Sequence, residues 1–503
     1  MADTLAAKLA LARGVGAISR RRGGGGTSAP GKLLMRLAPG AIGRLGARLP
    51  RGSVLISATN GKTTTAAMAA GILERAGISL VHNQAGANMA GGIATTLLAA
   101  ARPRGAIAGE LGLFEVDELW LAQLASELRP RAILLGNLFR DQLDRYGELD
   151  TIAERWEEVL RERGAASGGE RKLVLNADDP LIADLGREHA GVLYFGMDDD
   201  SLALPGMAHA ADAKHCRRCG APYVFDAIYL GHLGHYHCAS CGRSRPAPAV
   251  TATDVRLEGV RAARFTLSTP AGQAEVSLAL PGLYNVYNAL AAAALATALS
   301  VPLGTIVAGL DATRPAFGRA ETVTLSVPAL PAAAAAAAGT PAGTDAAASP
   351  ATRELRILLV KNPAGANEVL RTLALEPGEH DLLGVLNDHI ADGRDVSWIW
   401  DADFELLTGR IRRATCSGTR AADLAARLKY AGIDPARIDV REDLADALRT
   451  AAADRPGPAK RLGAGDERGG SAAAPLFALP TYTAMLALRE LLVERGEASS
   501  AWS

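Results

Sequence analysis

One stretch, residues 54–65, constrains the fold of this chain more than any other part of its sequence. The apolar run Val54–Ile56 predicts a buried strand, and Gly61-Lys62-Thr63 stands where an alanine-rich helix begins. This order is typical of a phosphate-binding loop, in which backbone N–H groups and a lysine meet the anion and a threonine hydroxyl meets its Mg²⁺. An ordinary turn with a solvated lysine is the simpler alternative, but three consecutive threonines after the lysine favour the phosphate site. Ile56 stands where the general pattern has glycine, so the loop is a variant.

Length and charge exclude several classes of protein. At 503 residues the chain can hold two or three domains, since single cores stop growing at about 250–300 residues. The 54 basic and 54 acidic residues balance, which argues against a nucleic-acid partner. No apolar run reaches the roughly 18–20 residues that a membrane-spanning helix needs. We therefore expect a cytoplasmic protein.

Residues 1–50 predict a basic, helical segment in front of the first domain. Leu5, Leu9 and Leu11 could form an apolar helix face beside Lys8 and other basic residues. Such a face could make peripheral contact with the inner surface of the plasma membrane. A helix packed loosely on the protein is the interpretation that we favour.

Apolar runs and helical patterns alternate between residue 54 and about residue 200. This alternation predicts an α/β fold, with a parallel sheet covered by helices on both faces. The predicted strands are Val54–Ile56, Ala106–Ala108, Ala132–Leu135, Leu173–Leu175 and Val192–Phe195. Antiparallel strands are predicted within Val250–Leu280, followed by a helix over Tyr284–Leu299. Ligands of such sheets bind beyond the carboxyl ends of the strands.

A low-complexity stretch separates two halves of the chain. Residues 327–352 are mostly Ala, Pro, Gly, Ser and Thr, which favours a linker. Strands of a second α/β unit are predicted at Arg356–Val360, Asp381–Leu386, Val396–Trp400, Arg413–Cys416 and Leu476–Leu479, and 455–473 is predicted to be a flexible insertion. The predicted domains are therefore a central domain at 51–325 with an insertion at 206–246, a linker at 326–353, and a C-terminal domain at 354–497.

Four cysteines form two Cys-x₂-Cys pairs, Cys216/Cys219 and Cys238/Cys241, and each pair is followed by glycine. Two such knuckles place four thiolates around Zn²⁺. A disulfide is a poor alternative in a cytoplasmic chain, and a redox pair would not need a second copy. Because all four positions are filled, the predicted zinc is structural.

Acidic and amide residues follow several predicted strands, where the ligand crevice should lie. Glu115, with Asp117 and Glu118 close behind, could hold a second Mg²⁺, although a surface acidic turn is an equal alternative for the latter two. Asn137 and Asp141 follow one strand. Three further amides follow the same pattern: Asn176 stands at the end of a predicted strand, and Asn285 and Asn288 stand at the start of a predicted helix.

Together these motifs resemble the central domain of the Mur ligases. The motifs are Thr59-Asn60-Gly61-Lys62-Thr63-Thr64, Glu115, Asn137 with Asp141 and Asp144, Asn176-Ala177-Asp178-Asp179-Pro180, Tyr284-Asn285-Val286-Tyr287-Asn288 and Gly318-Arg319-Ala320-Glu321. The cysteine quartet and three more segments are similar to the MurT family, the ligase-like subunits of lipid II isoglutaminyl synthases. These segments are His82-Asn83, Lys361-Asn362-Pro363 and Asp392-Gly393-Arg394-Asp395.

The resemblance implies a Mur ligase-like P-loop domain with an inserted Cys₄ zinc ribbon and a Rossmann-like C-terminal domain. It implies ATP, Mg²⁺ and Zn²⁺, and a GatD-like glutaminase partner that supplies ammonia. This subunit would phosphorylate the α-carboxylate of D-glutamate in lipid II, and ammonia would give D-isoglutamine. Nucleotide would contact Thr59, Asn60, Gly61, Lys62, Thr63, Thr64, Glu115, Asn137, Asp141, Asn176, Asn285 and Arg319.

Asp395 would complete the partner's Cys-His pair from across the interface, although by sequence alone Asp392 and Asp401 are equal contenders. One departure concerns metal binding, because Trp156 falls near the position of the lysine that is carbamylated in amino-acid-adding Mur ligases. A stand-alone Mur-type ligase that adds an amino acid is the main alternative. A zinc-ribbon protein that binds nucleotide without catalysis is a third reading.

Overall fold

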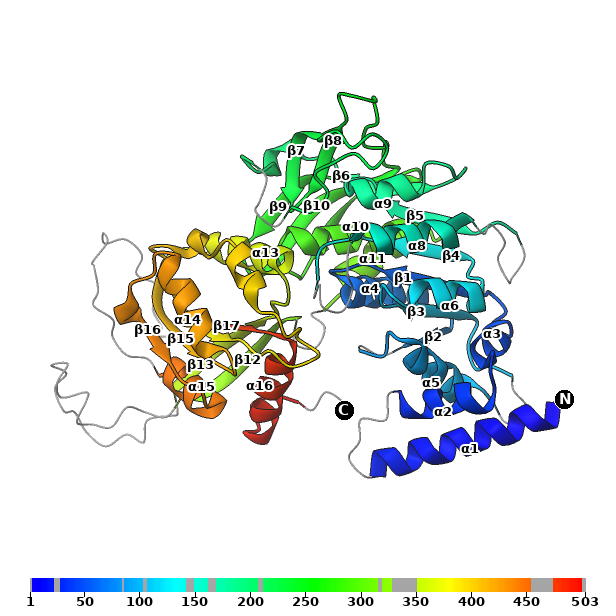
Figure 1. The fold of residues 1–503 in the computed structure, drawn as a ribbon, viewed down its shortest axis with the longest axis horizontal. Helices are drawn as coiled ribbons and strands as arrows, with labels where there is room; N and C mark the ends of the chain where they lie inside the picture. Colours follow the sequence, from blue (N-terminus) through cyan, green and yellow to red (C-terminus); the bar gives the residue numbers. More distant parts are fainter. Residues whose placement is uncertain are drawn as a thin grey trace. The chain divides into compact units, whose positions relative to one another are not determined.

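The computed structural model describes residues 2–21, 28–83, 86–102, 106–141, 149–161, 169–206, 211–314, 319–327, 351–453 and 474–499. The chain divides into two compact units, Met1–Arg314 and Pro315–Ser503, and each unit is built around its own sheet (Figure 1). The predicted α/β class is confirmed in both.

The first unit contains a nine-stranded sheet with the order β11-β10-β9-β6-β5-β4-β1-β3-β2. The strands from β2 to β9 in this order run parallel, and β9, β10 and β11 form an antiparallel meander. Their bounds are β1 Ser53–Ser57, β2 Leu80–His82, β3 Leu111–Glu115, β4 Ala132–Leu135, β5 Lys172–Asn176, β6 Leu193–Met197, β9 Val250–Glu258, β10 Ala262–Thr269 and β11 Gly272–Leu278.

Helices cover both faces of this sheet, as the alternating pattern predicts. On one face α4 contacts α10 and α11. The remaining helices share a single apolar core on the other face. The helix bounds are α1 Ala2–Arg21, α2 Ala29–Leu37, α3 Ala41–Gly46, α4 Lys62–Arg75, α5 Ala90–Ala100, α6 Leu121–Leu128, α8 Leu149–Arg161, α9 Pro180–Leu185, α10 Leu283–Ala298 and α11 Leu303–Asp311.

One predicted strand of this sheet is wrong. The strand next to β1 lies at Leu111–Glu115 and not at Ala106–Ala108, where Ile107 makes only an isolated bridge to Ala101. The segment at 111–115 is buried along its whole length between β1 and β2. A strand flanked on both sides and covered on both faces needs such a continuous buried run.

The N-terminal helix α1 packs on α2 and α5. Leu9 and Ala12 are buried in the shared core, and the guanidinium of Arg13 donates to the carbonyl oxygens of Leu98 and Ala101. Leu11 faces outward and is 57% exposed. Among the helices that the structure describes, none combines the length and apolar character needed to cross a bilayer.

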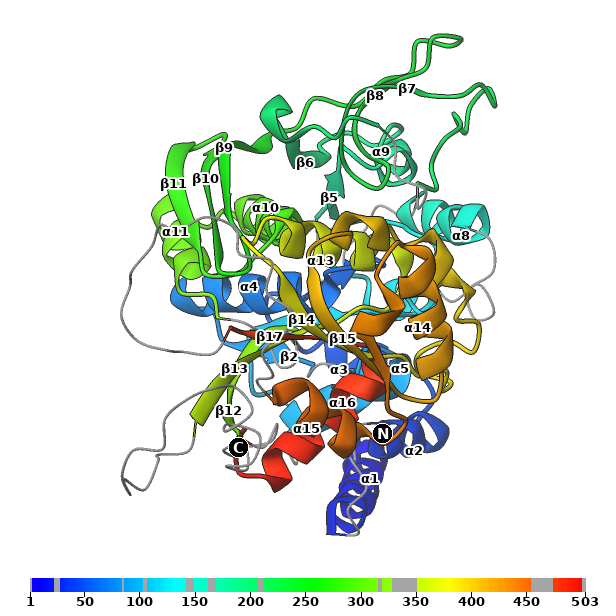
Figure 2. The same cartoon turned by 90° about the vertical axis from the view of Figure 1, so that its left-hand side faces the viewer.

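The insertion between β6 and β9 forms a hairpin of β7 Val224–Leu230 and β8 Leu233–His237, preceded by the 3₁₀ turn η1 Asp200–Leu202. Since β6 and β9 are parallel neighbours, the insertion leaves and rejoins the sheet without breaking it. The hairpin and α1 lie at opposite ends of the first unit (Figures 1 and 2).

The second unit contains a six-stranded sheet with the order β12-β13-β17-β14-β15-β16, in which only the β12–β13 pair is antiparallel. The strands are β12 Arg319–Val327, β13 Ala351–Leu358, β14 His380–Val385, β15 Ile411–Ser417, β16 Ile438–Val440 and β17 Leu476–Pro480. The helices are α13 Pro363–Ala374, α14 Ala421–Tyr430, α15 Leu444–Ala452 and α16 Tyr482–Glu494, with 3₁₀ turns η2 Ser397–Asp401, η3 Phe404–Leu407 and η4 Pro435–Arg437.

The division between the units lies earlier than the sequence boundary at 325. Residues 319–325, which were expected in the central domain, form most of β12 and pair with β13 of the second unit. Val323, Leu325 and Val327 point into the core of that unit. Most of the predicted linker (328–350) and all of the predicted insertion at 455–473 lie outside the described residues.

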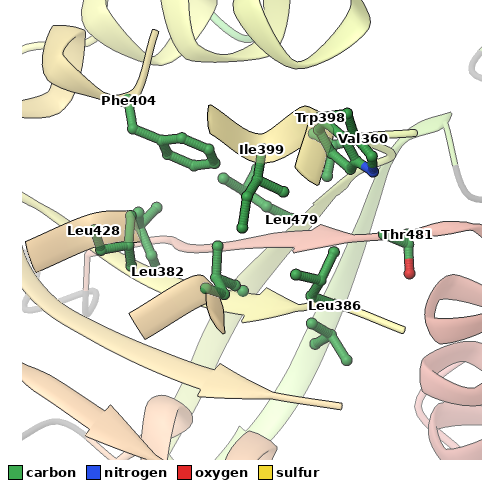
Figure 3. A pocket seen from close by; sticks show the side chains of 12 residues that line it. Val360, Leu382, Leu386, Trp398, Ile399, Phe404, Leu428, Leu479 and Thr481 are labelled. Carbon is green, nitrogen blue, oxygen red and sulfur yellow. The ribbon is translucent and has the colours of Figure 1, made fainter. Parts of the chain in front are cut away.

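The predicted strand at Val396–Trp400 is also wrong, because this segment forms the 3₁₀ turn η2. Its apolar residues cover one face of the second sheet, where Ile399 and Phe404 lie over Leu382 and Leu479 (Figure 3). The cavity between them measures about 20 Å³, the room of about one water molecule. This layer is therefore a packed core.

Candidate active site

The carboxyl ends of β1, β3, β4 and β5 meet at one edge of the first sheet. These strands are parallel, with Ile56 beside Glu115 and Ser57 beside Leu135. The loops that follow them therefore form a common crevice, which is where ligands of such sheets bind. Thr59–Thr64, Glu115, Asn137 and Asp141 all lie at this edge.

Gly61 shapes the turn between β1 and α4. Its φ of +83° lies in the left-handed region, which glycine alone adopts without strain. A Cβ at this position would collide with Oδ1 of Asn288 on α10. Helix α4 begins at Lys62, and the N–H groups of a first helical turn have no intrahelical acceptor. The turn therefore aims backbone donors and the positive end of the helix dipole at the crevice.

Lys62 is held among carboxylates. Its Nζ lies 2.8 Å from Oε2 of Glu118 and also donates to the carbonyl oxygen of Ala58. Burial alone would lower the pKa of this ammonium, but the charge of Glu118, with Glu115 and Asp117 behind it, outweighs burial and raises the pKa. Lys62 therefore stays charged, and the acidic residues after β3 keep it beside the crevice.

Asn137 clasps the loop from the end of β4. Its Oδ1 accepts the N–H of Asn60 at 2.9 Å, its Nδ2 donates to the carbonyl of Asn60 at 3.0 Å, and its own carbonyl accepts the N–H of Thr59. The hydroxyl of Thr59 accepts the N–H of Phe139 and donates to its carbonyl oxygen. Thr59, Asn60 and Asn137 thus position the loop by bonding one another.

The other predicted amides tie elements together. Asn176 donates to the carbonyl of Gly136 at 2.9 Å and accepts the N–H of Asp178 at 3.0 Å. Asn285 donates to the carbonyl of Pro281, and its Oδ1 accepts from Asn288 at 3.0 Å. Asn288 is the amide of α10 that lies against Gly61, because a Cβ at that glycine would collide with its Oδ1.

Glu115 and Asp141 are both buried at the crevice edge. The backbone of Glu115 is fixed by Asn83, which accepts its N–H and donates to its carbonyl at 2.9 Å each. Trp156 is buried, and its indole N–H donates to the carbonyl of Glu118 at 3.0 Å. An indole is a donor only, so Trp156 offers no ligand to Mg²⁺.

The four cysteine sulfurs come together in the insertion, within 4.8 Å of one another. Sγ of Cys216 and Cys241 are 3.7 Å apart, and Sγ of Cys219 and Cys238 are 3.4 Å apart. A tetrahedral zinc with sulfur at 2.3 Å requires separations of about 3.8 Å. Burial would raise the pKa of Cys216, but the backbone N–H groups of Cys219 and Arg218 outweigh it and lower that pKa. The quartet therefore fits structural Zn²⁺.

The loop after β14 carries the acidic residues of the second unit. Asp392 is buried and accepts the N–H of Thr483 at 2.7 Å and its hydroxyl. Asp395 is exposed, and its Oδ1 accepts the N–H of Ser397 at 2.8 Å. The hydroxyl and N–H of Ser397 hold the pKa of Asp395 below its ordinary value. Asp392 thus anchors the loop, while Asp395 presents an ionised carboxylate at the surface.

Comparison with known proteins identifies the family. Residues 56–219 match the Mur ligase middle domain and residues 359–485 match the MurT ligase C-terminal domain. Subunit MurT of the glutamine-hydrolysing lipid II isoglutaminyl synthase of Streptococcus pneumoniae is 31% identical over 474 residues, 94% of this chain and 93% of the relative. The chain belongs to the MurT family. The MurT subunit of Staphylococcus aureus is 32% identical, covering 83% of this chain and 85% of that relative.

Solved structures of Mur-type ligases share the fold. MurF of Acinetobacter baumannii matches with a TM-score of 0.60 at 20% identity, covering 93% of this chain and 81% of its own. A pseudomurein peptide ligase type C of Methanothermus fervidus matches with a TM-score of 0.59 at 22% identity, covering 89% and 79%. As a MurT-family chain with a Mur ligase middle domain, the protein is an ATP-dependent ligase.

In this MurT-family chain, residues that the sequence grouped belong to different units. Arg319 begins β12 in the second unit, where its backbone pairs with Leu358, whereas the loop at 59–64 belongs to the first unit. Sequence reasoning missed the pairing of Lys62 with Glu118. The carboxylate was visible after β3, but only the fold shows which of the acidic residues 115, 117 and 118 reaches the lysine.

Proposed function

We propose that this chain is the synthase subunit of a lipid II isoglutaminyl synthase. It would use ATP to amidate the α-carboxylate of D-glutamate in the stem peptide of lipid II, giving D-isoglutamine. The observation that carries the proposal is the turn at Gly61, which aims the start of α4 and the ammonium of Lys62 at the crevice. The likeness to MurT subunits over nearly the whole chain supports the choice of substrate.

The proposed reaction has two steps. A carboxylate oxygen bonds to the γ-phosphorus of ATP while the bond to the β–γ bridging oxygen breaks, so ADP leaves and an acyl phosphate forms. The nitrogen of ammonia then bonds to the acyl carbon, the C–O bond to phosphate breaks, and the nitrogen loses a proton. Phosphate departs with one former carboxylate oxygen.

The residues of the crevice perform the first step by positioning and charge. Lys62 and the first-turn N–H groups of α4 would hold the phosphates, and Asn137 would keep the loop in place. Bound Mg²⁺ neutralises charge that develops on phosphate oxygens. Glu115, Asp141 and the hydroxyls of Thr63 and Thr64 are the groups at this edge that would hold it. Thr59, Asn60, Asn176, Asn285 and Arg319 remain predicted nucleotide residues.

Ammonia would come from a GatD-like glutaminase subunit. Asp395 is proposed to orient the imidazole of that partner's Cys-His pair, since an aspartate in a triad fixes the tautomer and stabilises the imidazolium. Its exposed, ionised carboxylate on an anchored loop suits this part. A lipid-linked substrate would bring the enzyme to the inner membrane surface, where α1 could make peripheral contact.

Lipid II amidation by the purified chain tests the proposal. The chain would be incubated with lipid II and Mg-ATP, alone with an ammonium salt or with its glutaminase partner and glutamine, and the product read by mass spectrometry. We expect amidated lipid II in both arms, and ADP release that depends on lipid II. Addition of a free amino acid without a partner would support the stand-alone ligase instead, and nucleotide binding without turnover would support the non-catalytic reading.

A further inference from the structure

The turn of the zinc-ribbon hairpin lies directly behind the proposed nucleotide loop. His232, in the turn between β7 and β8, packs against Phe139 with ring centroids 4.5 Å apart. Both side chains are buried, at 0% and 2% exposure. Gly231 has a φ of +59°, and a Cβ there would lie 2.7 Å from the Phe139 ring. The turn can therefore approach this closely only with glycine at 231.

Two aspartates flank the His232 ring, and both hold the same segment. Asp179 accepts the N–H of Leu138 at 2.8 Å, and its Oδ2 lies 3.4 Å from Nε2 of His232. Asp212 accepts the N–H of Arg140 at 2.9 Å, and its own N–H donates to Nδ1 of His232 at 3.3 Å. Because Nδ1 accepts, the neutral ring carries its proton on Nε2, the nitrogen near the Asp179 carboxylate, although the two groups do not form a hydrogen bond.

Residues 137–140, which the insertion contacts through His232 and Asp212, also hold the proposed nucleotide loop at 59–61. The N–H of Phe139, between those of Leu138 and Arg140, donates to the hydroxyl of Thr59 at 3.0 Å. Asn137 clasps Asn60 through both ends of its amide. A continuous set of contacts thus runs from His232 through Phe139 to the turn that precedes Lys62.

We propose that His232 is a positioning residue for nucleotide binding, through which the zinc ribbon holds residues 137–140 and so the loop at 59–61. The inference rests on the proposed nucleotide site at 59–64. It gives the inserted ribbon a function within the ligase reaction, although its zinc has no open coordination position. His232 touches neither the nucleotide nor the zinc ligands in this scheme.

The test compares variants of the full-length chain by calorimetric titration with Mg-ADP and by steady-state kinetics. His232→Ala should retain one zinc per chain but bind Mg-ADP about tenfold more weakly, as contacting residues couple by such amounts. The KM for ATP should rise by the same factor, while kcat at saturating ATP and the KM for lipid II change less than about twofold. His232→Gln, which keeps a donor toward Asp179, should recover part of the affinity.

A matched control comes from the same strand hairpin. His235 bonds the carbonyl of Met197 on β6 and contacts Tyr229, so His235→Ala should leave the affinity for Mg-ADP unchanged. If His232→Ala loses zinc or fails to fold, Phe139→Leu probes the contact from the nucleotide side and should weaken Mg-ADP binding similarly. Where both variants fold, combining them should add little to either alone.

Three outcomes would overturn the inference: unchanged Mg-ADP affinity in His232→Ala, unchanged affinity in Phe139→Leu, or full additivity in the double variant. A wild-type chain that binds no Mg-ADP would instead overturn the proposed nucleotide site itself. Zinc content, measured on each sample with a colorimetric chelator, separates an effect on the loop from loss of the ribbon.

Discussion

The ammonium of Lys62 lies 2.8 Å from the carboxylate of Glu118, and in the proposed site it would also contact the phosphates of the nucleotide. We expect Lys62→Ala to lower lipid II amidation at least about 10²-fold, since removing a preorganised charge from a transition state has effects of this size. Amidation would be followed with ammonium as the nitrogen source, and circular dichroism would verify the fold. Retention of near wild-type amidation would exclude Lys62 from the phosphate site.

Two glycines of the same region give opposite expectations. Gly61→Ala should destabilise the chain by about 1–2 kcal/mol through left-handed strain, plus the collision with Asn288, and should abolish nucleotide binding. Gly71→Ala, in the middle of α4 with open space around its Cβ position, should stabilise by about 0.5–1 kcal/mol. Thermal unfolding and Mg-ADP titration of both variants check this pair. If the two variants had the same stability and the same affinity for Mg-ADP, the turn would not require a residue with left-handed backbone angles at position 61.

The residue types in the sequence predicted the phosphate loop itself, but not the distant residues that contact it. The order of apolar run, glycine, lysine and threonine is local, so Gly61 and Lys62 could be placed from sequence. Asn288 and Glu118 meet them only through the fold, one from α10 and one from the segment after β3. The contact between Phe139 and His232 joins parts of the chain about ninety residues apart, and no local pattern indicates it.

At the scale of elements, the cysteine-bearing insertion has a small core, and we expect this core to need a bound zinc. Its buried residues Cys216, Tyr223, Tyr236 and Cys238 cluster with Ala183 of α9, which is too little apolar surface for the insertion to fold without a metal. Removing zinc with a chelator should raise hydrogen exchange throughout 211–245 while β1, β4 and β5 stay protected. Exchange read by mass spectrometry, with zinc added back as the control, checks this. Unchanged protection of the ribbon would contradict a structural zinc.

The second sheet carries a buried ion network across its strands. Asp381 on β14 bonds Arg353 on β13 and Arg412 on β15. Burial alone would raise the pKa of Asp381, but hydrogen bonds from Arg412 and Arg353 outweigh it and lower the pKa. A carboxyl with a lowered folded-state pKa stabilises above its unfolded pKa of about 3.9, and that contribution is lost as the pH falls through the folded value.

Asp381→Asn should therefore destabilise the second unit by about 3–5 kcal/mol at neutral pH, because Arg353 would be left buried without a counter-charge. Urea unfolding followed by fluorescence measures the change. Asp439→Asn breaks the more exposed pair with Arg413 on β15 and β16 and should change stability by less than about 1 kcal/mol. If Asp381→Asn and Asp439→Asn lowered the free energy of unfolding by similar amounts, burial of the Asp381 ion network would add nothing to stability.

Strands with continuous apolar runs were predictable, and segments that depend on the fold were not. β1, β4 and β5 lie within one residue of their predicted bounds, because turn-forming residues end each run. Val396–Trp400 has a strand-like composition, yet Asp395 accepts the N–H of Ser397, where a 3₁₀ turn begins that places Ile399 on the sheet. The alternation of Val323, Leu325 and Val327 was a usable signal for β12, but it stood beside the low-complexity stretch and was overlooked.

At the scale of the whole molecule, the lysine proposed to bind phosphate lies in the first unit, and the aspartate proposed to complete the partner's glutaminase triad lies in the second. Asp395→Asn should reduce amidation from glutamine by about 10²-fold or more, since wrong orientation of a triad histidine is costly, but leave amidation from ammonium intact. Lys62→Ala should reduce both, while glutamine hydrolysis by the complex continues. Normal glutamine hydrolysis in the Asp395 variant would remove this residue from the proposed triad.

Strand β12 has a practical consequence for anyone who wishes to study the second unit in isolation. A fragment that starts at the apparent boundary near residue 354 would lack β12 and the first three residues of β13, and would leave the rest of β13 with bare backbone donors and acceptors along the rim that β12 covers. Unprotected rims of this kind recruit other chains and aggregate. A soluble fragment should therefore begin before Arg319, at the cost of carrying the alanine-rich stretch along.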